Sequence, residues 1–181
     1  MIRTLTLLAL SSLATAAPAL AQEPPKEAAK VSAPEAFESP IKNAKGDTIG
    51  KLTIRDGANN LVLRVAIQPG GLPPGWHGMH FHAVGDCSDA KFMNSKAHVN
   101  HDQSKHGLLN PDGPDEGDLA NIFANQDGSA NAEVSSETAL TGEGGLKDGD
   151  GSALIIHANE DDHTTQPIGG AGDRIACGVI K

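Results

Sequence analysis

Short runs of alternating apolar and polar residues, each ended by Gly, Asn, Asp or Pro, dominate this sequence from about residue 37 onward. Residues 47–55 and 61–67 alternate with the period of two that places every second side chain on one face of a strand. The five residues between them have the composition of a turn. Further short strands are expected over residues 79–84, 119–124, 129–135, 153–158 and 174–180. With almost no helical periodicity, the sequence predicts an all-β fold, an antiparallel sandwich or barrel.

Two long segments without periodicity interrupt these strands. Residues 85–117 are polar and rich in Gly, Pro and His, and residues 159–173 form a second such segment. A loop as long as the first is uncommon inside a compact domain and is usually functional. The alternative is that the strands on either side of it are wrongly assigned.

The N-terminus is predicted to be a secretory signal peptide over residues 1–21. Arg3 supplies the positive charge, residues 5–13 supply an apolar stretch, and Ala19-Leu20-Ala21 fits the cleavage pattern. A retained membrane anchor is the alternative, although the apolar stretch is short for a span. Residues 22–36 are rich in Pro, Ala, Glu and Lys and are expected to be a flexible lead-in to one domain over residues 37–181.

Export would place the two cysteines in an oxidising compartment. Cys87 and Cys177 are the only cysteines, so a single disulfide between them is predicted. Two buried thiols are the alternative.

The formal net charge of −9 bears on the partners of the protein. It argues against binding to nucleic acid or to an anionic membrane. It also repels anionic substrates, so any anion chemistry needs a local group of positive charges.

All eight histidines lie between His77 and His163. In His80-Phe81-His82, strand geometry places both imidazoles on the same face. Copper favours imidazole nitrogen, whereas zinc accepts both imidazole and carboxylate. The combined set therefore suits a histidine-rich redox site and a His/Asp structural site, although each loop residue taken alone could be a solvated side chain. The candidates outside the pair are His98, His101, His106, Asp115, Asp118 and His157.

Several motifs in this region resemble those of the copper/zinc superoxide dismutases, and of their bacterial secreted branch in particular. The resemblance spans about residues 33–181 and implies a Greek-key antiparallel β-barrel of about eight strands with two long functional loops. The motifs, in chain order, are Gly78-Met79-His80-Phe81-His82, Gly85-Asp86-Cys87, Lys105-His106-Gly107, Gly117-Asp118-Leu119, Ile156-His157 and Arg174-Ile175-Ala176-Cys177-Gly178-Val179-Ile180.

The resemblance also implies roles for individual residues. One copper ion per chain would be bound by His80, His82, His98 and His157. Zinc would be bound by His98, which bridges the two metals, together with His106 and Asp118. Asp161 would hydrogen-bond to ligands of both metals, and Cys87 and Cys177 would form the family disulfide. His77 matches a structural histidine that binds no metal.

The sequence departs from the family at one zinc ligand, where Asp115 replaces a histidine. Three outcomes are open. Asp115 could bind zinc itself, His101 could take the place of the missing ligand, or zinc could bind weakly or not at all.

A second departure concerns the cations that attract the substrate. Residues 158–173 contain no Lys or Arg. Arg174 is therefore expected to orient the anion, assisted by Lys91, Lys96 or Lys105, and association is expected to be slower than in relatives with a lysine in this loop. His98 is expected to serve also as a proton source.

The implied function is a superoxide dismutase that converts superoxide to dioxygen and hydrogen peroxide by cycling copper between Cu(II) and Cu(I). Superoxide is the implied partner, with no nucleic acid or membrane, and the enzyme would be a periplasmic or secreted monomer or homodimer. The alternative is a copper-binding or copper-delivery module on the same fold without enzymatic activity.

Overall fold

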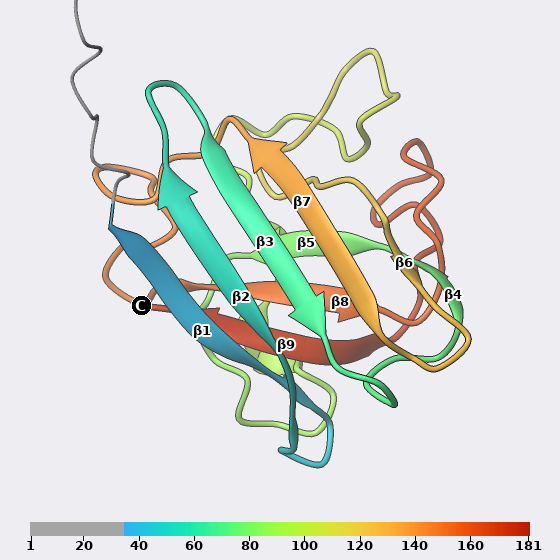
Figure 1. Ribbon diagram of the computed structural model, residues 1–181. Helices are drawn as coiled ribbons and strands as arrows, with labels where there is room; N and C mark the ends of the chain where they lie inside the picture. The colour runs from blue at the N-terminus through green and yellow to red at the C-terminus, as the bar shows by residue number, and fades with distance from the viewer. Residues whose placement is uncertain (1–34) are drawn as a thin grey trace, which may run out of the picture. The chain divides into compact units, whose positions relative to one another are not determined.

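A computed structural model describes residues 35–181 as nine strands and one short 3₁₀ helix (Figure 1). The predicted signal peptide and all but the last two residues of the predicted lead-in lie outside the described residues. The elements are β1 (Ala36–Asn43), β2 (Thr48–Asp56), β3 (Leu61–Ile67), β4 (Gly75–His77), β5 (Met79–His82), η1 (Met93–Ser95), β6 (Ile122–Ala124), β7 (Ala130–Ser136), β8 (Ser152–His157) and β9 (Arg174–Ile180).

Seven strands form one antiparallel sheet, in the order β5-β8-β9-β1-β2-β3-β7, and β4 pairs with β6 in a second small sheet. The large sheet curls, so that β5, β8 and β9 cross behind β1, β2 and β3 (Figure 1). The predicted all-β antiparallel architecture is confirmed, as a half-barrel closed in part by the small sheet.

The core fills the inside of this curl. In β3, Leu61, Leu63, Val65 and Ile67 are buried and the residues between them are more exposed. This is the alternation that the sequence predicts. By contrast, β8 is buried at every position, because both of its faces are covered.

Two strands, β1 and β4, were not among the predicted strands. Pro40 within β1 argues against a strand, because proline cannot donate a ladder hydrogen bond. In the structure Pro40 pairs only with Lys51 of β2, and the pairing with β9 begins at Ile41. The missing N–H is thus placed where β1 has a single neighbour.

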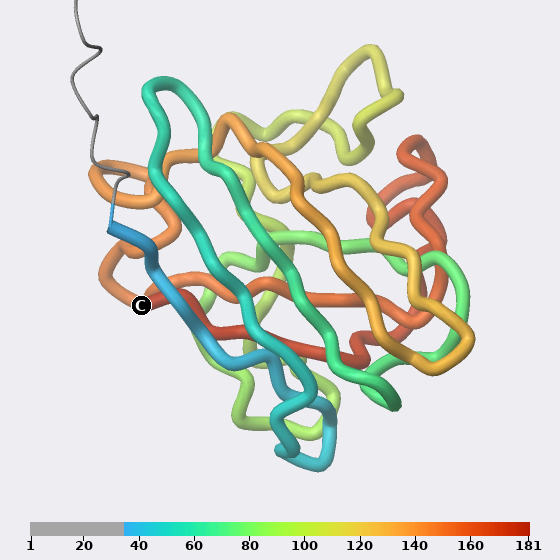
Figure 2. Tube along the Cα trace, viewed as in Figure 1, coloured from blue at the N-terminus to red at the C-terminus, as the bar shows by residue number. Residues whose placement is uncertain are grey.

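The two long segments approach each other at one end of the sheet (Figure 2). The backbone N–H of Leu109 donates to the carbonyl of His163 at 3.1 Å, and Gln166 hydrogen-bonds to the backbone of His106. The predicted disulfide joins Cys87 in the first segment to Cys177 in β9. A loop of 90 residues closed in this way stabilises the fold by about 4–5 kcal/mol in the chain-entropy treatment.

Within residues 35–181, no helix is long and apolar enough to cross a membrane.

Candidate metal centre

Two histidines of β5 lie in the interior of the fold. His80 and His82 are both buried, and their intervening neighbour Phe81 belongs to the apolar core. The chain returns to this strand twice after β5, through isolated bridges between His82 and His98 of the first long segment and between His80 and Asp118, which directly follows that segment. These bridges fix two loop residues beside the strand pair.

His157 reaches the same place from the end of β8. The β8–β9 register shifts between Ile156 and His157, and such an irregularity re-aims the side chain at that point. The centroid of the His157 ring lies 4.9 Å from that of His80. The rings of His80 and His98 are closer still, at 4.2 Å, and the His82 and His98 rings are 5.1 Å apart. The structure thus brings together all four residues predicted to bind copper.

Each of these four rings has one nitrogen fixed by a neighbour. His80 Nε2 lies 2.7 Å from Asp161, and His98 Nδ1 lies 3.0 Å from Asp115. The other two use Nδ1 to donate to backbone carbonyls, His82 to that of Lys96 at 2.8 Å and His157 to that of Gly172 at 2.9 Å.

The opposite nitrogen of each ring is buried and has no hydrogen-bond partner. These atoms are His80 Nδ1, His82 Nε2, His98 Nε2 and His157 Nε2. Buried polar atoms are nearly always paired, so four unpaired imidazole nitrogens in one cluster require an explanation. His80, His82 and His98 each offer a ligand atom within 4.8 Å of the others, and the His157 ring lies beside that of His80. The residues therefore fit a metal ion that prefers nitrogen ligands, such as copper.

Burial also favours the neutral, metal-binding form of these rings. Desolvation, with the nearby His98, lowers the pKa of His82 to about 2. Desolvation and the neighbouring His80 lower the pKa of His157 to about 3. Neither ring therefore carries a proton that would compete with a metal at neutral pH.

A second cluster lies on the other side of His98. His98, His106, Asp115 and Asp118 are all buried, and each offers a ligand atom within 4.8 Å of the others. The donor set of two imidazoles and two carboxylates is chemically suited to zinc.

The His106 ring of this cluster lies between two carboxylates, those of Asp118 and Asp161. Burial alone would lower the pKa of His106, but hydrogen bonds to Asp118 and Asp161 outweigh it and raise the pKa to about 10. Burial alone would likewise raise the pKa of Asp161, but its hydrogen bonds from His106 and His80 hold it well below the usual range. A site that stabilises a proton this strongly between carboxylates also favours a bound cation.

His101 does not join this cluster. Its Nδ1 lies 2.5 Å from the carboxylate of Glu116, its backbone N–H donates to the same oxygen at 2.7 Å, and its side chain is 51% exposed. His77 also lies apart, with its two ring nitrogens 2.8 Å from the carbonyl oxygens of His157 and Pro73. This placement agrees with the structural role expected for His77.

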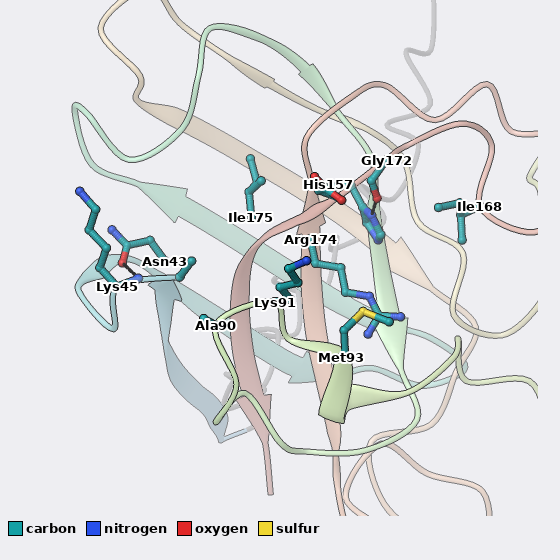
Figure 3. Close-up of a pocket in the computed structure, with 12 residues that line it drawn as sticks. Asn43, Lys45, Ala90, Lys91, Met93, His157, Ile168, Gly172, Arg174 and Ile175 are labelled. Atoms are coloured by element: carbon teal, nitrogen blue, oxygen red, sulfur yellow. Dashed lines mark hydrogen bonds between the residues drawn. The ribbon is translucent and has the colours of Figure 1, made fainter.

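A cavity of about 530 Å³ opens beside the cluster of His80, His82, His98 and His157. His157 and Arg174 lie in its wall (Figure 3). Lys91 also lines it, as does Lys45 from the β1–β2 turn, whereas Lys96 and Lys105 do not. Lys45 was not among the predicted cations. It is far from the histidine motifs in sequence, and only the pairing of β1 with β9 brings its turn to the cavity.

The family profile described as copper/zinc superoxide dismutase matches residues 48–180. A superoxide dismutase [Cu-Zn] of Caulobacter vibrioides is 49% identical over 146 residues, which are 78% of this chain and 83% of the relative. A crystal structure of a SOD-like protein from Bacillus subtilis has a TM-score of 0.74 at 30% identity, over 80% of this chain and 97% of that one. The Cu/Zn superoxide dismutase of Brucella abortus has a TM-score of 0.64 at 26% identity, over 81% of this chain and 100% of that one.

The profile match and the Caulobacter relative agree with the two adjoining clusters. One contains His80, His82 and His98, with the His157 ring beside His80, and the other contains mixed imidazoles and carboxylates. The chain therefore belongs to the copper/zinc superoxide dismutase family, and it is a superoxide dismutase whose family metals are copper and zinc.

Proposed function

We propose that the protein disproportionates superoxide at a copper ion held by four imidazoles. The observation that carries this assignment is the set of four buried, unpaired ring nitrogens that belong to one cluster. When bound, copper supplies a one-electron couple that oxidises one superoxide to dioxygen and reduces a second, with two protons, to hydrogen peroxide. The proposed ligands are His80, His82, His98 and His157.

Arg174 is proposed to bind and orient the superoxide anion. Its Nη1 donates to the carbonyl of Phe92 at 2.8 Å and to Ser95 Oγ at 3.1 Å, and its Nη2 donates to the carbonyl of Lys96 at 2.7 Å. These bonds fix the guanidinium plane and leave Nε–H and one Nη2–H for an anion. A guanidinium stays charged at any physiological pH, so the clamp is always available.

His98 is proposed to hold a proton for the reduced oxygen. Its Nε2 faces the copper cluster and has no partner, while its Nδ1 is directed at Asp115. Because Nε2 is also a proposed copper ligand, it can carry this proton only while it is not bound to the metal. The proton can then pass to an anion beside Arg174 without a change in the orientation of the ring, which is held through Nδ1.

Zinc is proposed to bind through His98, His106, Asp115 and Asp118. Of the three outcomes left open by the sequence, ligation by Asp115 has the best support, because its carboxylate is buried 3.0 Å from His98 Nδ1. The backbone N–H of Asp115 also donates to Asp118 at 3.0 Å, which holds the two carboxylates together. With two carboxylates, the donor set carries one more negative charge than a set with histidine at position 115.

Export to the periplasm or the exterior is proposed from the N-terminal pattern and from the disulfide. The proposal includes cleavage near Ala21, a flexible segment over residues 22–36, and a monomer or homodimer with no nucleic-acid or membrane partner. N-terminal sequencing of the secreted fraction tests the cleavage site.

Metal analysis combined with superoxide turnover tests the central assignment. We expect about one copper per mature chain and turnover that scales with copper content. Replacement of His82 by Gln should remove most of the copper, whereas His101→Gln, an exposed histidine outside both clusters, should leave copper content and turnover unchanged.

The same experiment separates the enzyme from a copper-delivery module. Full copper loading with negligible turnover favours the delivery module, in which Arg174 has no anion to bind. Failure of the protein to bind copper after loading rejects both assignments.

A further inference from the structure

Asp161 occupies a central place between the two proposed metal sites. It is 1% exposed, and its Oδ2 accepts from His80 Nε2 at 2.7 Å. Its Oδ1 lies 3.2 Å from His106 Nε2 and accepts from the backbone N–H of His163 at 2.7 Å. One carboxylate thus orients a ring from each metal site, so its own position controls both.

The segment that carries Asp161 is held by the side-chain amide of Asn121. Asn121 Oδ1 accepts from the backbone N–H of Asp161 at 3.0 Å, and Nδ2 donates to the carbonyl of Asp161 at 2.9 Å. Because an amide oxygen is needed opposite the N–H, the orientation of the Asn121 amide is fixed by these two bonds.

The same amide also binds His163. Asn121 Nδ2 donates to His163 Nε2 at 3.1 Å, so both of its N–H groups are used and the neutral His163 ring carries its proton on Nδ1. His163 Nδ1 is buried and unpaired, and it lies 3.6 Å from Asp161 Oδ2. Asn121 and His163 therefore hold Asp161 from two sides.

Close packing leaves the Asp161 side chain little room to take another position. A Cβ placed on Gly169 would collide with Asp161 Oδ1, and one placed on Gly78 would lie 3.1 Å from Asp161 Cβ. Asn121 itself follows Asp118 by three residues, so its amide joins the segment that carries a proposed zinc ligand to the loop of Asp161.

We propose that Asn121, supported by His163, is a positioning residue that sets where the Asp161 carboxylate meets His80 and His106. It touches neither metal nor substrate and acts only through Asp161. This inference rests on the metal assignment proposed above. Its consequence is that one amide outside both ligand sets controls zinc retention and the orientation of a copper ligand together.

Two measurements on Asn121→Ala test the proposal. In the metal-free mature protein, the imidazole N–H protons of His80 and His106 that face Asp161 should exchange at least about tenfold faster by NMR, as expected for loss of about one hydrogen bond. In the loaded enzyme, zinc should pass to a chelator about tenfold faster, and the copper(II) EPR spectrum should change. The first measurement needs no metal, so its outcome is independent of whether the loaded protein turns over superoxide.

Asn125→Ala is the matched control, because Asn125 lies four residues away and its exposed side chain bonds only Ser129 Oγ. It should behave as the parent protein in both measurements. If Asn121→Ala exchanges and releases zinc at the parent rates, the proposal is wrong.

A variant with a smaller change covers the case in which Asn121→Ala does not fold. His163→Gln keeps both hydrogen bonds between Asn121 and the Asp161 backbone, and it should give effects of the same sign and smaller size. If His163→Gln matches the parent in proton exchange and zinc release, the proposal is rejected.

Discussion

His157 and Arg174 are direct register partners at the end of the β8–β9 ladder. A proposed copper ligand and the proposed anion clamp are thus attached to neighbouring strands, next to the irregularity that turns His157 inward. Two paired strands are more rigid than a loop, so the sheet itself sets the distance between His157 and Arg174.

Replacement of Arg174 by Lys should lower kcat/KM about tenfold or more with copper content unchanged. Lysine keeps the charge but cannot bond Phe92, Ser95 and Lys96 while also offering paired donors to an anion. Pulse radiolysis measures the rate. Arg64→Lys is the control, since Arg64 is exposed and pairs with Glu133. Equal rates for Arg174→Lys and the parent would remove Arg174 from the anion site.

Lys45 and Lys91 should increase the association rate by attracting superoxide to the cavity. A unit charge about 10 Å from the anion contributes about 0.4 kcal/mol in water, so each Lys→Gln change should lower kcat/KM about twofold at low salt. The two effects should shrink at high ionic strength. Lys51→Gln, at an exposed pair with Glu38 away from the cavity, should have no effect. A twofold loss that is the same at every salt concentration would argue against steering.

Asp115→Ala should lower zinc affinity at least about tenfold, because it removes a buried carboxylate from the proposed donor set. Asp115→His should keep zinc bound, since imidazole is an equally suitable ligand and the remaining donors are unchanged. Competition with a chromophoric chelator measures both affinities. Unchanged zinc binding in Asp115→Ala would show that this carboxylate is not a ligand.

The sequence predicts much of this site, but unevenly. The pairing of His80 with His82 follows from the two-residue period of a strand, which is a local property. The positions of His98 and Asp118 beside that strand depend on isolated bridges from a loop that has no periodicity. Only the resemblance to a known family could assign them, because no local pattern encodes such a bridge.

Two residues that contribute to the site, Lys45 and Asn121, were not predicted from the sequence, and the physical reasons differ. Lys45 lies on a turn next to β1, and Pro40 hides β1 from a pattern-based prediction. Asn121 has no ligand chemistry of its own, and its role comes only from contacts with residues about forty positions away. The fate of Asp115 stayed open for the same reason, since ligation depends on where a loop folds.

The metal-free protein should be most stable near pH 6.5. In the folded state the pKa of His82 is about 2 and that of His157 is about 3. Between those values and pH 6.5, these two rings bind protons in the unfolded state but not in the folded state. Acidification therefore destabilises the fold, by up to about 1.4 kcal/mol per pH unit for each ring.

The opposite slope comes from His106, whose folded pKa is about 10. Its stabilising effect is complete below pH 6.5 and is lost as the pH rises towards 10. Urea unfolding of the metal-free protein across this range measures both slopes. His106→Gln should abolish the alkaline slope and keep the acidic one. A stability that is flat from pH 4 to 9 would contradict the prediction.

Lys96→Gly should stabilise the protein without loss of activity. Lys96 has φ 67° and ψ −149°, a backbone region that only glycine adopts readily. Its carbonyl accepts from His82 Nδ1 and Arg174 Nη2, so the strained conformation holds the acceptor for both groups.

Glycine relieves about 1–3 kcal/mol of strain and loses about 0.5–1 kcal/mol through the entropy of the unfolded chain. The expected net gain in the free energy of unfolding is therefore up to about 2.5 kcal/mol, measured with urea. Gln103→Gly, at an exposed position with φ 62°, is the comparison, since this site has no role in holding His82 or Arg174. A Lys96→Gly protein that is less stable than the parent would mean that the lysine side chain contributes more than the strain removes.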